Sequence, residues 1–352
     1  MKVMNTKIYK IDMENIQTEY IKEAGQLLLA GEVVAIPTET VYGLGGNGLD
    51  VSAAQKIYAA KGRPSDNPLI IHVADWESLE KITMDVPEEA RKVADVFWPG
   101  PLTMIFKKND KVPYETTGGL DSVAVRMPSH PIALEVIRQG GGYIAAPSAN
   151  TSGRPSPTRA EHVIEDLSGK IAMILDGGPV GIGLESTILD FTEEIPTIQR
   201  PGAITLDMLS EVIGEVRLDP GLNEENENIR PKAPGMRYRH YAPKAKLIVV
   251  EGEADAVVER INTLYAEKTK EGHKVGIIST DESREKYPFG VVKSIGSREE
   301  EETIAQNLYH ILRDYDEEDV DLIYSESFRT PKLGLAIMNR LLKAAGHQVL
   351  EV

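Results

Sequence analysis

The chain has 352 residues, 41% of them hydrophobic and 27% charged, and this length predicts two domains because one core rarely organises so many residues. Its 39 basic and 55 acidic residues give a formal net charge of −16, which argues against a general nucleic-acid-binding protein because phosphate contacts dominate such binding. The sequence contains no cysteine, which excludes disulfides, thiolate zinc sites and a cysteine nucleophile.

The sequence also bears on location. Residues 1–17 alternate polar and apolar side chains and lack the continuous apolar stretch of a signal peptide. No segment has enough consecutive apolar residues to span a bilayer. We therefore expect a cytoplasmic protein with no membrane partner.

The first predicted elements are a helix, a strand and a loop. Apolar side chains recur at helical spacing over 18–30, and the apolar run 33–36 predicts a buried strand. Residues 37–46 predict a ligand-binding loop, because the hydroxyls of Thr38 and Thr40 precede glycines that would let the backbone approach a ligand. A plain glycine-rich turn is the alternative for residues 37–46. The order of the first two elements, a helix followed by a strand, favours an α/β fold.

A predicted helix over 52–60 leads into a basic stretch that begins at Lys61. Pro64 and Pro68 favour an extended turn, which would hold the side chains of Lys61 and Arg63 in place. A guanidinium offers a planar fork of donors and an ammonium a compact charge, so together they suit a polyphosphate. A solvated basic turn is the alternative.

Further strands are predicted over 69–73, 102–106, 122–128, 143–146 and 171–176, with a helix over 87–97. Arg126 lies near the end of one of these strands among apolar neighbours, where it needs a partner such as a ligand carboxylate. Ser148 and Asn150 follow another strand and can donate to phosphate oxygens. The glycine spacing of a nucleophilic serine elbow is missing there, which argues against covalent catalysis.

The composition changes between about 215 and 245, where prolines, cations and aromatic residues predict a linker. The run from Arg237 to Tyr241 suits a strap folded over a nucleotide, and a stiffened linker is the alternative. From residue 246, predicted strands (247–250, 274–279, 291–295, 320–325) alternate with helices (253–269, 299–315, 333–345), which predicts a small parallel α/β domain. It has no glycine-rich phosphate fingerprint, so we expect it to bind no dinucleotide.

Several motifs follow one another along the chain. They are Pro-Thr-Glu-Thr-Val-Tyr-Gly-Leu from 37, Lys-Gly-Arg from 61 with Asn67 and His72, Ser-Ala-Asn from 148 with Ser156, Ser-Thr-Ile from 186, Arg-Pro-Gly from 200 and His-Tyr-Ala-Pro from 240. Together they resemble the YrdC-type threonylcarbamoyl-AMP synthase family, in its long form with an additional C-terminal domain, over nearly the whole chain. The resemblance implies a YrdC-like twisted open α/β sheet domain with a concave cleft (1–214), a linker strap over the active site (215–245) and a Rossmann-like α/β domain (246–352).

The resemblance implies a nucleotidyltransferase. It would combine L-threonine, bicarbonate and ATP into L-threonylcarbamoyladenylate and release pyrophosphate, the first step of N6-threonylcarbamoyladenosine modification of tRNA next to the anticodon. Downstream threonylcarbamoyl-transferase proteins would be its partners, without stable nucleic-acid binding, and Mg²⁺ would be bound through the ATP phosphates and not by protein side chains. The alternatives are an RNA-binding module and a carbamoyl-adenylating enzyme, although such enzymes carry zinc-finger and acylphosphatase-like domains that this sequence lacks.

The resemblance also assigns residues by motif. The catalytic set around the ATP phosphates is Lys61, Arg63, Ser148 and Asn150, and further ATP contacts fall on Asn67, Ser122, Ser156, Arg200 and Tyr241. Threonine contacts fall on Thr38, Thr40, His72, Arg126, Ala146 and Ser186. Three points stay open: whether Tyr238 takes the place of Tyr241, which of Thr38 and Thr40 contacts the ligand, and whether His72 is a base or only a binding residue.

Overall fold

The computed structural model describes residues 5–223 and 240–352, and the chain divides into two compact units. The first comprises Met1–Ser152, Ser156–Gly181 and Glu185–Tyr238, and the second Gly153–Pro155, Ile182–Leu184 and Arg239–Val352. Residues 224–239 of the predicted strap, Tyr238 among them, lie outside the described residues. Within the described ranges, no helix is long and apolar enough to cross a membrane.

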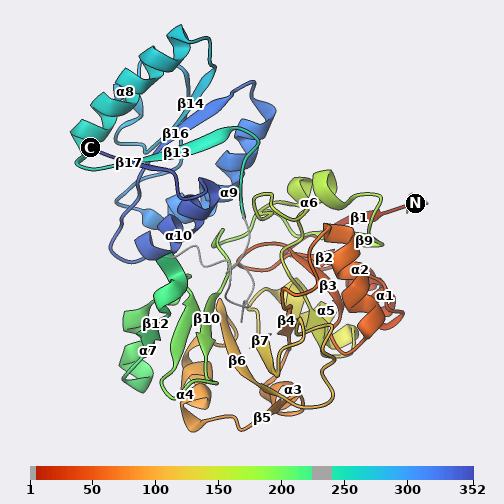
Figure 1. The fold of residues 1–352 in the computed structure, drawn as a ribbon. Helices are drawn as coiled ribbons and strands as arrows, with labels where there is room; N and C mark the ends of the chain where they lie inside the picture. The colour runs from red at the N-terminus through yellow and green to blue at the C-terminus, as the bar shows by residue number, and fades with distance from the viewer. Residues whose placement is uncertain (1–4, 224–239) are drawn as a thin grey trace. The chain divides into compact units, whose positions relative to one another are not determined.

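The first unit is a mixed α/β structure (Figure 1). Its strands are β1 (Lys7–Lys10), β2 (Val34–Ile36), β3 (Gly43–Asn47), β4 (Ile70–His72), β5 (Thr83–Met84), β6 (Leu102–Lys108), β7 (Ser122–Arg126), β8 (Ile144–Ala145), β9 (Met173–Asp176), β10 (Thr187–Asp190), β11 (Thr197–Arg200) and β12 (Arg217–Leu218). Its helices are α1 (Thr18–Leu29), α2 (Val51–Lys61), α3 (Trp76–Glu80), α4 (Glu88–Phe97), α5 (Pro131–Gln139), α6 (Ala160–Leu167) and α7 (Leu206–Ile213), followed by the 3₁₀ turn η1 (Pro220–Asn223). The predicted α/β class is confirmed.

These strands form one sheet in the order β1-β9-β2-β3-β8-β4-β7-β6-β10-β11-β12, with β5 paired to β6. At its centre β4 and β7 run parallel, so that Ile70 pairs with Ala124 and His72 with Arg126. On the other side of β4, β8 runs antiparallel and places Ile144 opposite His72. This register decides which predicted site residues share an edge of the sheet.

The glycine-rich stretch that the sequence assigned to a ligand loop is partly a strand. Gly43–Asn47 forms β3, which pairs with β2 and β8, so the loop prediction is wrong from Gly43 onwards. A Cβ on Gly45 would lie 2.9 Å from Ile144 Cγ2, and one on Gly46 would lie 3.0 Å from Ile57 Cδ1. The glycines therefore make room for neighbouring side chains of the core.

Helix α2 ends where the basic stretch begins. Asp50 caps its start by accepting a hydrogen bond from the Ser52 N–H, and Gly62 ends it in the left-handed conformation with φ 63°. The buried face of α2, which includes Ile57 and Tyr58, packs in the same core cluster as Leu44 of β3. The helix thereby fixes its last residue, Lys61, against the sheet.

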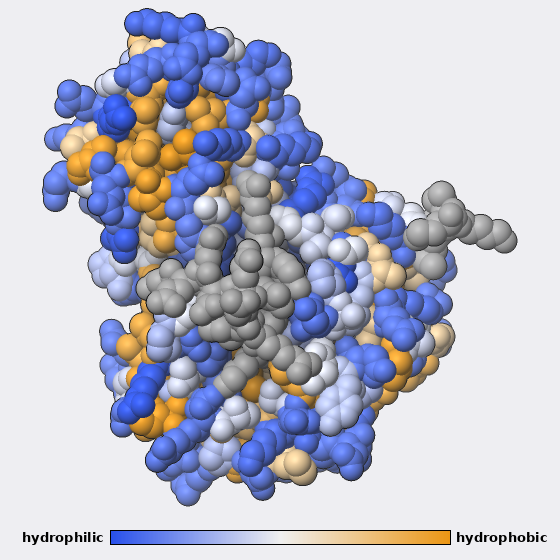
Figure 2. All heavy atoms as spheres, viewed as in Figure 1, coloured by the Kyte–Doolittle hydropathy of each residue, from blue (hydrophilic) through white to orange (hydrophobic). Residues whose placement is uncertain are grey.

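The second unit is a parallel α/β layer, as the sequence predicts (Figure 1). Its strands are β13 (Lys246–Glu251), β14 (Val275–Ser279), β15 (Val291–Ser294), β16 (Leu322–Glu326) and β17 (Val349–Glu351), in the order β15-β14-β16-β13-β17, and its helices are α8 (Ala254–Lys270), α9 (Glu301–Glu317) and α10 (Gly334–Ala344), with the 3₁₀ turn η2 (Arg284–Lys286). Successive residues of β14 face different helices, because Ile277 clusters with Val257 of α8 whereas Gly276 lies under the Tyr315 ring of α9. Figure 2 shows apolar residues reaching the surface of this unit.

Helices α1 and α5 approach each other closely in the first unit. Their apolar faces share one core cluster, in which Ala24 and Leu28 meet Ala133 and Val136. Gly25 permits this distance, since a Cβ there would lie 2.5 Å from Gln139 Cβ and 2.8 Å from the Gln139 carbonyl carbon. A backbone atom cannot rotate away, so the helices would have to separate.

We expect Gly25→Ala to destabilise the first unit by about 1–3 kcal/mol, because overpacking outweighs the gain of roughly 1 kcal/mol that alanine brings inside a helix. Both tryptophans of the chain, Trp76 and Trp98, lie in this unit, so their fluorescence in a denaturant titration reports its unfolding. Gln26→Ala, on the exposed side of the same helix, is the control. A Gly25→Ala protein as stable as the parent would contradict the close packing.

Candidate active site

Lys61 lies at the centre of the predicted catalytic set. Its side chain is 2% exposed, and Nζ donates to the backbone carbonyls of Ser148 (2.5 Å) and Asn150 (2.6 Å) and to Asn150 Oδ1 (3.3 Å). Ser148 Oγ donates to the same Oδ1 at 2.6 Å, and the Ser152 N–H donates to the Lys61 carbonyl at 2.9 Å. The structure therefore brings three of the four predicted catalytic residues together and holds one charge at a defined position.

Arg63 and Asn67 lie on the turn that follows. Arg63 Nη2 donates to the carbonyls of Asn67 (3.3 Å) and Pro68 (3.1 Å), so the guanidinium folds against its own turn. Asn67 is 1% exposed, and its Oδ1 is buried without a hydrogen-bond partner among the described residues. Buried amide oxygens are normally hydrogen-bonded, so this atom is a candidate acceptor for a ligand donor.

The strand register separates the predicted site residues into two groups. Asn67 lies just before β4, and Ser122 is the first residue of β7. His72 and Arg126 are the last residues of the same two parallel strands. Because a strand rises about 3.3 Å per residue, Ser122 and Arg126 lie roughly 13 Å apart along β7. Predicted nucleotide contacts thus begin these strands and predicted threonine contacts end them.

Hydroxyl and charged side chains gather around Arg126, which is 4% exposed. Arg126 Nη1 donates to Thr40 Oγ1 at 2.8 Å, and Nε donates to the Gly100 carbonyl at 3.3 Å. Thr38 Oγ1 lies 2.9 Å from Thr40 Oγ1 and donates to the Val41 carbonyl at 2.6 Å. Both threonines are therefore in the cluster, with Thr40 in direct contact with Arg126 and Thr38 behind it.

Arg126 also has a carboxylate partner that the sequence analysis did not identify. Glu39 Oε1 lies 2.7 Å from Arg126 Nη2 and accepts a hydrogen bond from the Ser129 N–H at 3.2 Å. Burial favours a higher pKa for Glu39, but the Arg126 charge and the backbone N–H groups of Glu39 and Ser129 outweigh it and hold the pKa below its usual value. The sequence does contain a signal, because a carboxylate between Thr38 and Thr40 in an apolar surrounding requires a cation.

His72 is buried and lies beside Arg126 across the strand pair. Its Nδ1 is 3.2 Å from the Ile70 carbonyl oxygen. Burial, and then the positive charge of Arg126, lowers the pKa of His72 to about 3. The imidazole is therefore neutral at physiological pH.

Ser186 joins the two groups of predicted contacts. Its Oγ lies 2.7 Å from Thr103 Oγ1 and accepts from Arg200 Nη2 at 3.1 Å, while Arg200 Nε donates to the Ser186 carbonyl at 3.0 Å. Thr103, a second residue that the sequence analysis missed, is the register partner of Arg126 on β6. Arg200, assigned to ATP by motif, thus contacts a residue assigned to threonine.

The remaining predicted residues have separate environments. Ser156 is 1% exposed, and its Oγ donates to Glu185 Oε1 at 2.6 Å. Ala146 is buried, and its N–H donates to the Ile70 carbonyl at 2.9 Å. Tyr241 belongs to the second unit, where its ring packs 5.0 Å from that of Tyr309.

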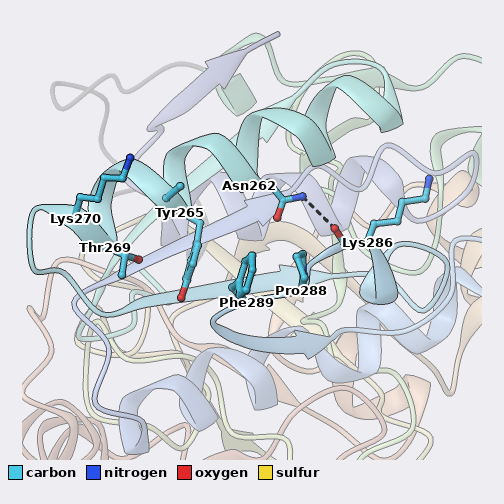
Figure 3. Close-up of a pocket in the computed structure, with 8 residues that line it drawn as sticks. Asn262, Tyr265, Thr269, Lys270, Lys286, Pro288 and Phe289 are labelled. Carbon is cyan, nitrogen blue, oxygen red and sulfur yellow. Dashed lines mark hydrogen bonds between the residues drawn. The ribbon is translucent and has the colours of Figure 1, made fainter.

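The second unit has a cavity of its own, of about 620 Å³ (Figure 3). Tyr265 and Phe289 stack beside it with ring centroids 6.1 Å apart, and Asn262 Nδ2 donates to the Lys286 carbonyl at 3.0 Å. None of the predicted site residues lines it. Over residues 5–223 and 240–352, no group of three or more His, Asp or Glu side chains is placed to hold a metal ion.

Comparison with known proteins covers nearly the whole chain. A family model described as "Telomere recombination" matches residues 26–202, and one described as "Threonylcarbamoyl-AMP synthase, C-terminal domain" matches 204–346. The chain is 50% identical over 351 residues to the threonylcarbamoyl-AMP synthase of Bacillus subtilis, which spans 99% of this chain and 100% of that protein. It is also 50% identical to the threonylcarbamoyl-AMP synthase of Pyrococcus abyssi, over 96% of this chain and 98% of that protein.

A solved structure supports the same relationship. The crystal structure of P. abyssi Sua5 complexed with L-threonine superposes with a TM-score of 0.93 at 48% identity, over 99% of this chain and 100% of that one. Identity of this level over both units leaves no part of the relationship resting on a single motif. This chain therefore belongs to the threonylcarbamoyl-AMP synthase family.

Proposed function

We propose that this chain synthesises L-threonylcarbamoyladenylate from L-threonine, bicarbonate and ATP and releases pyrophosphate, and that it is therefore a nucleotidyltransferase. The observation that carries this proposal is the presence of two distinct polar clusters, one around Lys61 and one around Arg126. The Lys61 cluster suits a polyphosphate, and the Arg126 cluster suits an amino acid. The family membership supports the same reaction.

The reaction needs no protein nucleophile. The threonine amine combines with carbon dioxide, releasing a proton, or with bicarbonate, releasing water, to give a carbamate. A carbamate oxygen then attacks the α-phosphorus of ATP. The bond from that phosphorus to the bridging oxygen breaks, and pyrophosphate leaves with the electron pair. We propose that Lys61, Arg63, Ser148 and Asn150 hold the phosphates in line for this attack, because catalysis here consists of positioning and charge neutralisation.

The donor set of the nucleotide group bears on Mg²⁺. The predicted nucleotide contacts offer cations, hydroxyls and amides but no carboxylate: they are Lys61, Arg63, Asn67, Ser122, Ser148 and Asn150. Mg²⁺ prefers carboxylate and phosphate oxygens, so in this site it fits as an ion carried by the ATP phosphates. Bound in that way, it supplies further neutralisation of the phosphate charge.

His72 suits hydrogen bonding better than general base catalysis. The Ile70 carbonyl can only accept, so we assign the proton to Nδ1 and leave Nε2 as an acceptor for the threonine hydroxyl. A histidine with a pKa of about 3 cannot hold a proton taken from an ammonium at neutral pH. His72 would thus recognise the side chain of threonine.

The product defines the cellular role that we propose. A threonylcarbamoyl-adenylate is an activated acyl donor, which threonylcarbamoyl-transferase proteins would consume to modify tRNA beside the anticodon. We place this chemistry in the cytoplasm, in keeping with a sequence that has no cysteine.

The reaction is tested by mass analysis of the product. ATP, L-threonine and bicarbonate together should yield threonylcarbamoyl-adenylate and pyrophosphate, and omission of threonine or bicarbonate should stop pyrophosphate release. Pyrophosphate release that ignores threonine would exclude the proposed reaction.

Loss of either basic side chain should remove activity without unfolding the protein. We expect Lys61→Ala and Arg63→Ala each to lower the rate of pyrophosphate release by about a hundredfold or more, because each removes a fixed charge from the transferring phosphates. Lys56→Ala is the matched control, since Lys56 lies on the same helix but pairs with Glu32 at 42% side-chain exposure. Near-normal rates in both site variants would contradict the assignment.

The lowered pKa of His72 also affects stability. Its ordinary pKa of about 6.5 applies in the unfolded chain, which therefore binds a proton below that pH while the folded protein does not. The contribution of His72 to the free energy of unfolding is fully present above its unfolded pKa of about 6.5. Below that pH the free energy of unfolding falls, by about 2 kcal/mol at pH 5 for this group.

We expect His72→Gln to lose correspondingly less stability between pH 8 and pH 5, measured by tryptophan fluorescence in denaturant. His273→Gln, at a half-exposed position of the second unit, should leave this pH dependence unchanged. An equal pH dependence in wild type and His72→Gln would show that folding does not lower the pKa of His72.

A further inference from the structure

Two buried polar atoms of the Glu39–Arg126 pair lack hydrogen-bond partners among residues 5–223 and 240–352. They are Glu39 Oε2, which can only accept when ionised, and Arg126 Nη2, which can only donate. Nη2 lies 2.7 Å from Glu39 Oε1 as an ion pair, but its N–H groups are not aligned on that oxygen. The pair therefore satisfies its charges while leaving one donor and one acceptor available.

This combination matches the two charged groups of an α-amino acid. A substrate carboxylate accepts where Nη2 donates, and a substrate ammonium donates where Oε2 accepts. Buried polar atoms without hydrogen-bond partners are uncommon in folded proteins. Here one ion pair has a donor and an acceptor without partners, which points to a ligand that carries both an acceptor and a donor. Thr40 already occupies Arg126 Nη1, which limits the guanidinium edge open to that ligand.

Charge balance favours the same ligand. The Arg126 and Glu39 side chains are only 5% and 14% exposed. A ligand with a net charge would therefore be poorly solvated beside them. The pair is neutral as a whole, and an α-amino acid zwitterion is also neutral. A carboxylic acid without the amine would bring an uncompensated negative charge beside Glu39.

We propose that Glu39 is a specificity-determining residue, whose Oε2 accepts from the substrate ammonium while Arg126 Nη2 donates to the substrate carboxylate. This inference rests on the proposed threonine site and deepens it. Glu39 thereby selects α-amino acids over carboxylic acids that have the same carbon skeleton but no amine.

The test compares L-threonine with 3-hydroxybutanoate, which is threonine without its amine, by calorimetric titration of the full-length protein. Wild type should prefer threonine by about a hundredfold or more, and Glu39→Gln should reduce this preference at least about tenfold, as expected for loss of a charge-assisted hydrogen bond. Glu135→Gln on α5, which removes a carboxylate of 38% side-chain exposure, should leave the preference unchanged.

Two results for Glu39→Gln would overturn the inference. An equal loss of affinity for both ligands would mean that Glu39 acts only by orienting Arg126, and unchanged affinities would mean that it takes no part. A wild type that binds neither ligand would instead remove the threonine site itself, and this inference with it.

A measurement on wild type alone covers the case in which Glu39→Gln does not fold. L-Threoninol keeps the ammonium and the hydroxyl but lacks the carboxylate, so it and 3-hydroxybutanoate each lack one half of the recognised pair. L-Threoninol should bind wild type at least about tenfold more weakly than threonine, and 3-hydroxybutanoate about a hundredfold or more weakly, as in the first comparison. Equal binding of 3-hydroxybutanoate and threonine would overturn the proposal without any variant.

Discussion

The parallel register of β4 and β7 is the constraint on which the candidate site depends. It pairs Ile70 with Ala124 and His72 with Arg126, and backbone hydrogen bonds between the strands fix that pairing. A slip of one residue would turn His72 and Arg126 to different faces of the sheet. Loops alone could not hold two groups of predicted ligand contacts at a constant separation, whereas adjacent paired strands can.

A buried ion pair such as Glu39 with Arg126 is weak evidence for stability, because desolvation of both charges offsets much of their attraction. Its value here lies in orientation. Glu39 holds the guanidinium in place, so a ligand bound to Arg126 would not bear the cost of ordering it. The unaligned contact between Nη2 and Oε1 preserves hydrogen-bonding capacity that an ideally aligned pair would use up.

The sequence predicted the elements whose patterns are local. Helix α2 could be recognised because Pro64 and Pro68 require a helix to break near Lys61, and the parallel second unit because its strands and helices alternate regularly. Strand β3 could not, since its glycines serve contacts with Ile144 and Ile57, which lie elsewhere in the sequence. The motif resemblance identified Arg126 but not Glu39. A buried guanidinium needs a carboxylate partner, and the sequence analysis expected the ligand to supply that carboxylate.

The chemistry explains why the site is made of fixed donors and acceptors and lacks an obvious reactive group. When both reactants are anionic at the moment of attack, the barrier comes from bringing them together, and pre-positioned charges lower it most effectively. A protonated His72 would add a second cation beside Arg126 and upset the neutrality that suits a zwitterion. Burial keeps His72 neutral, so the strand pair that would position the substrate also sets the charge around Arg126.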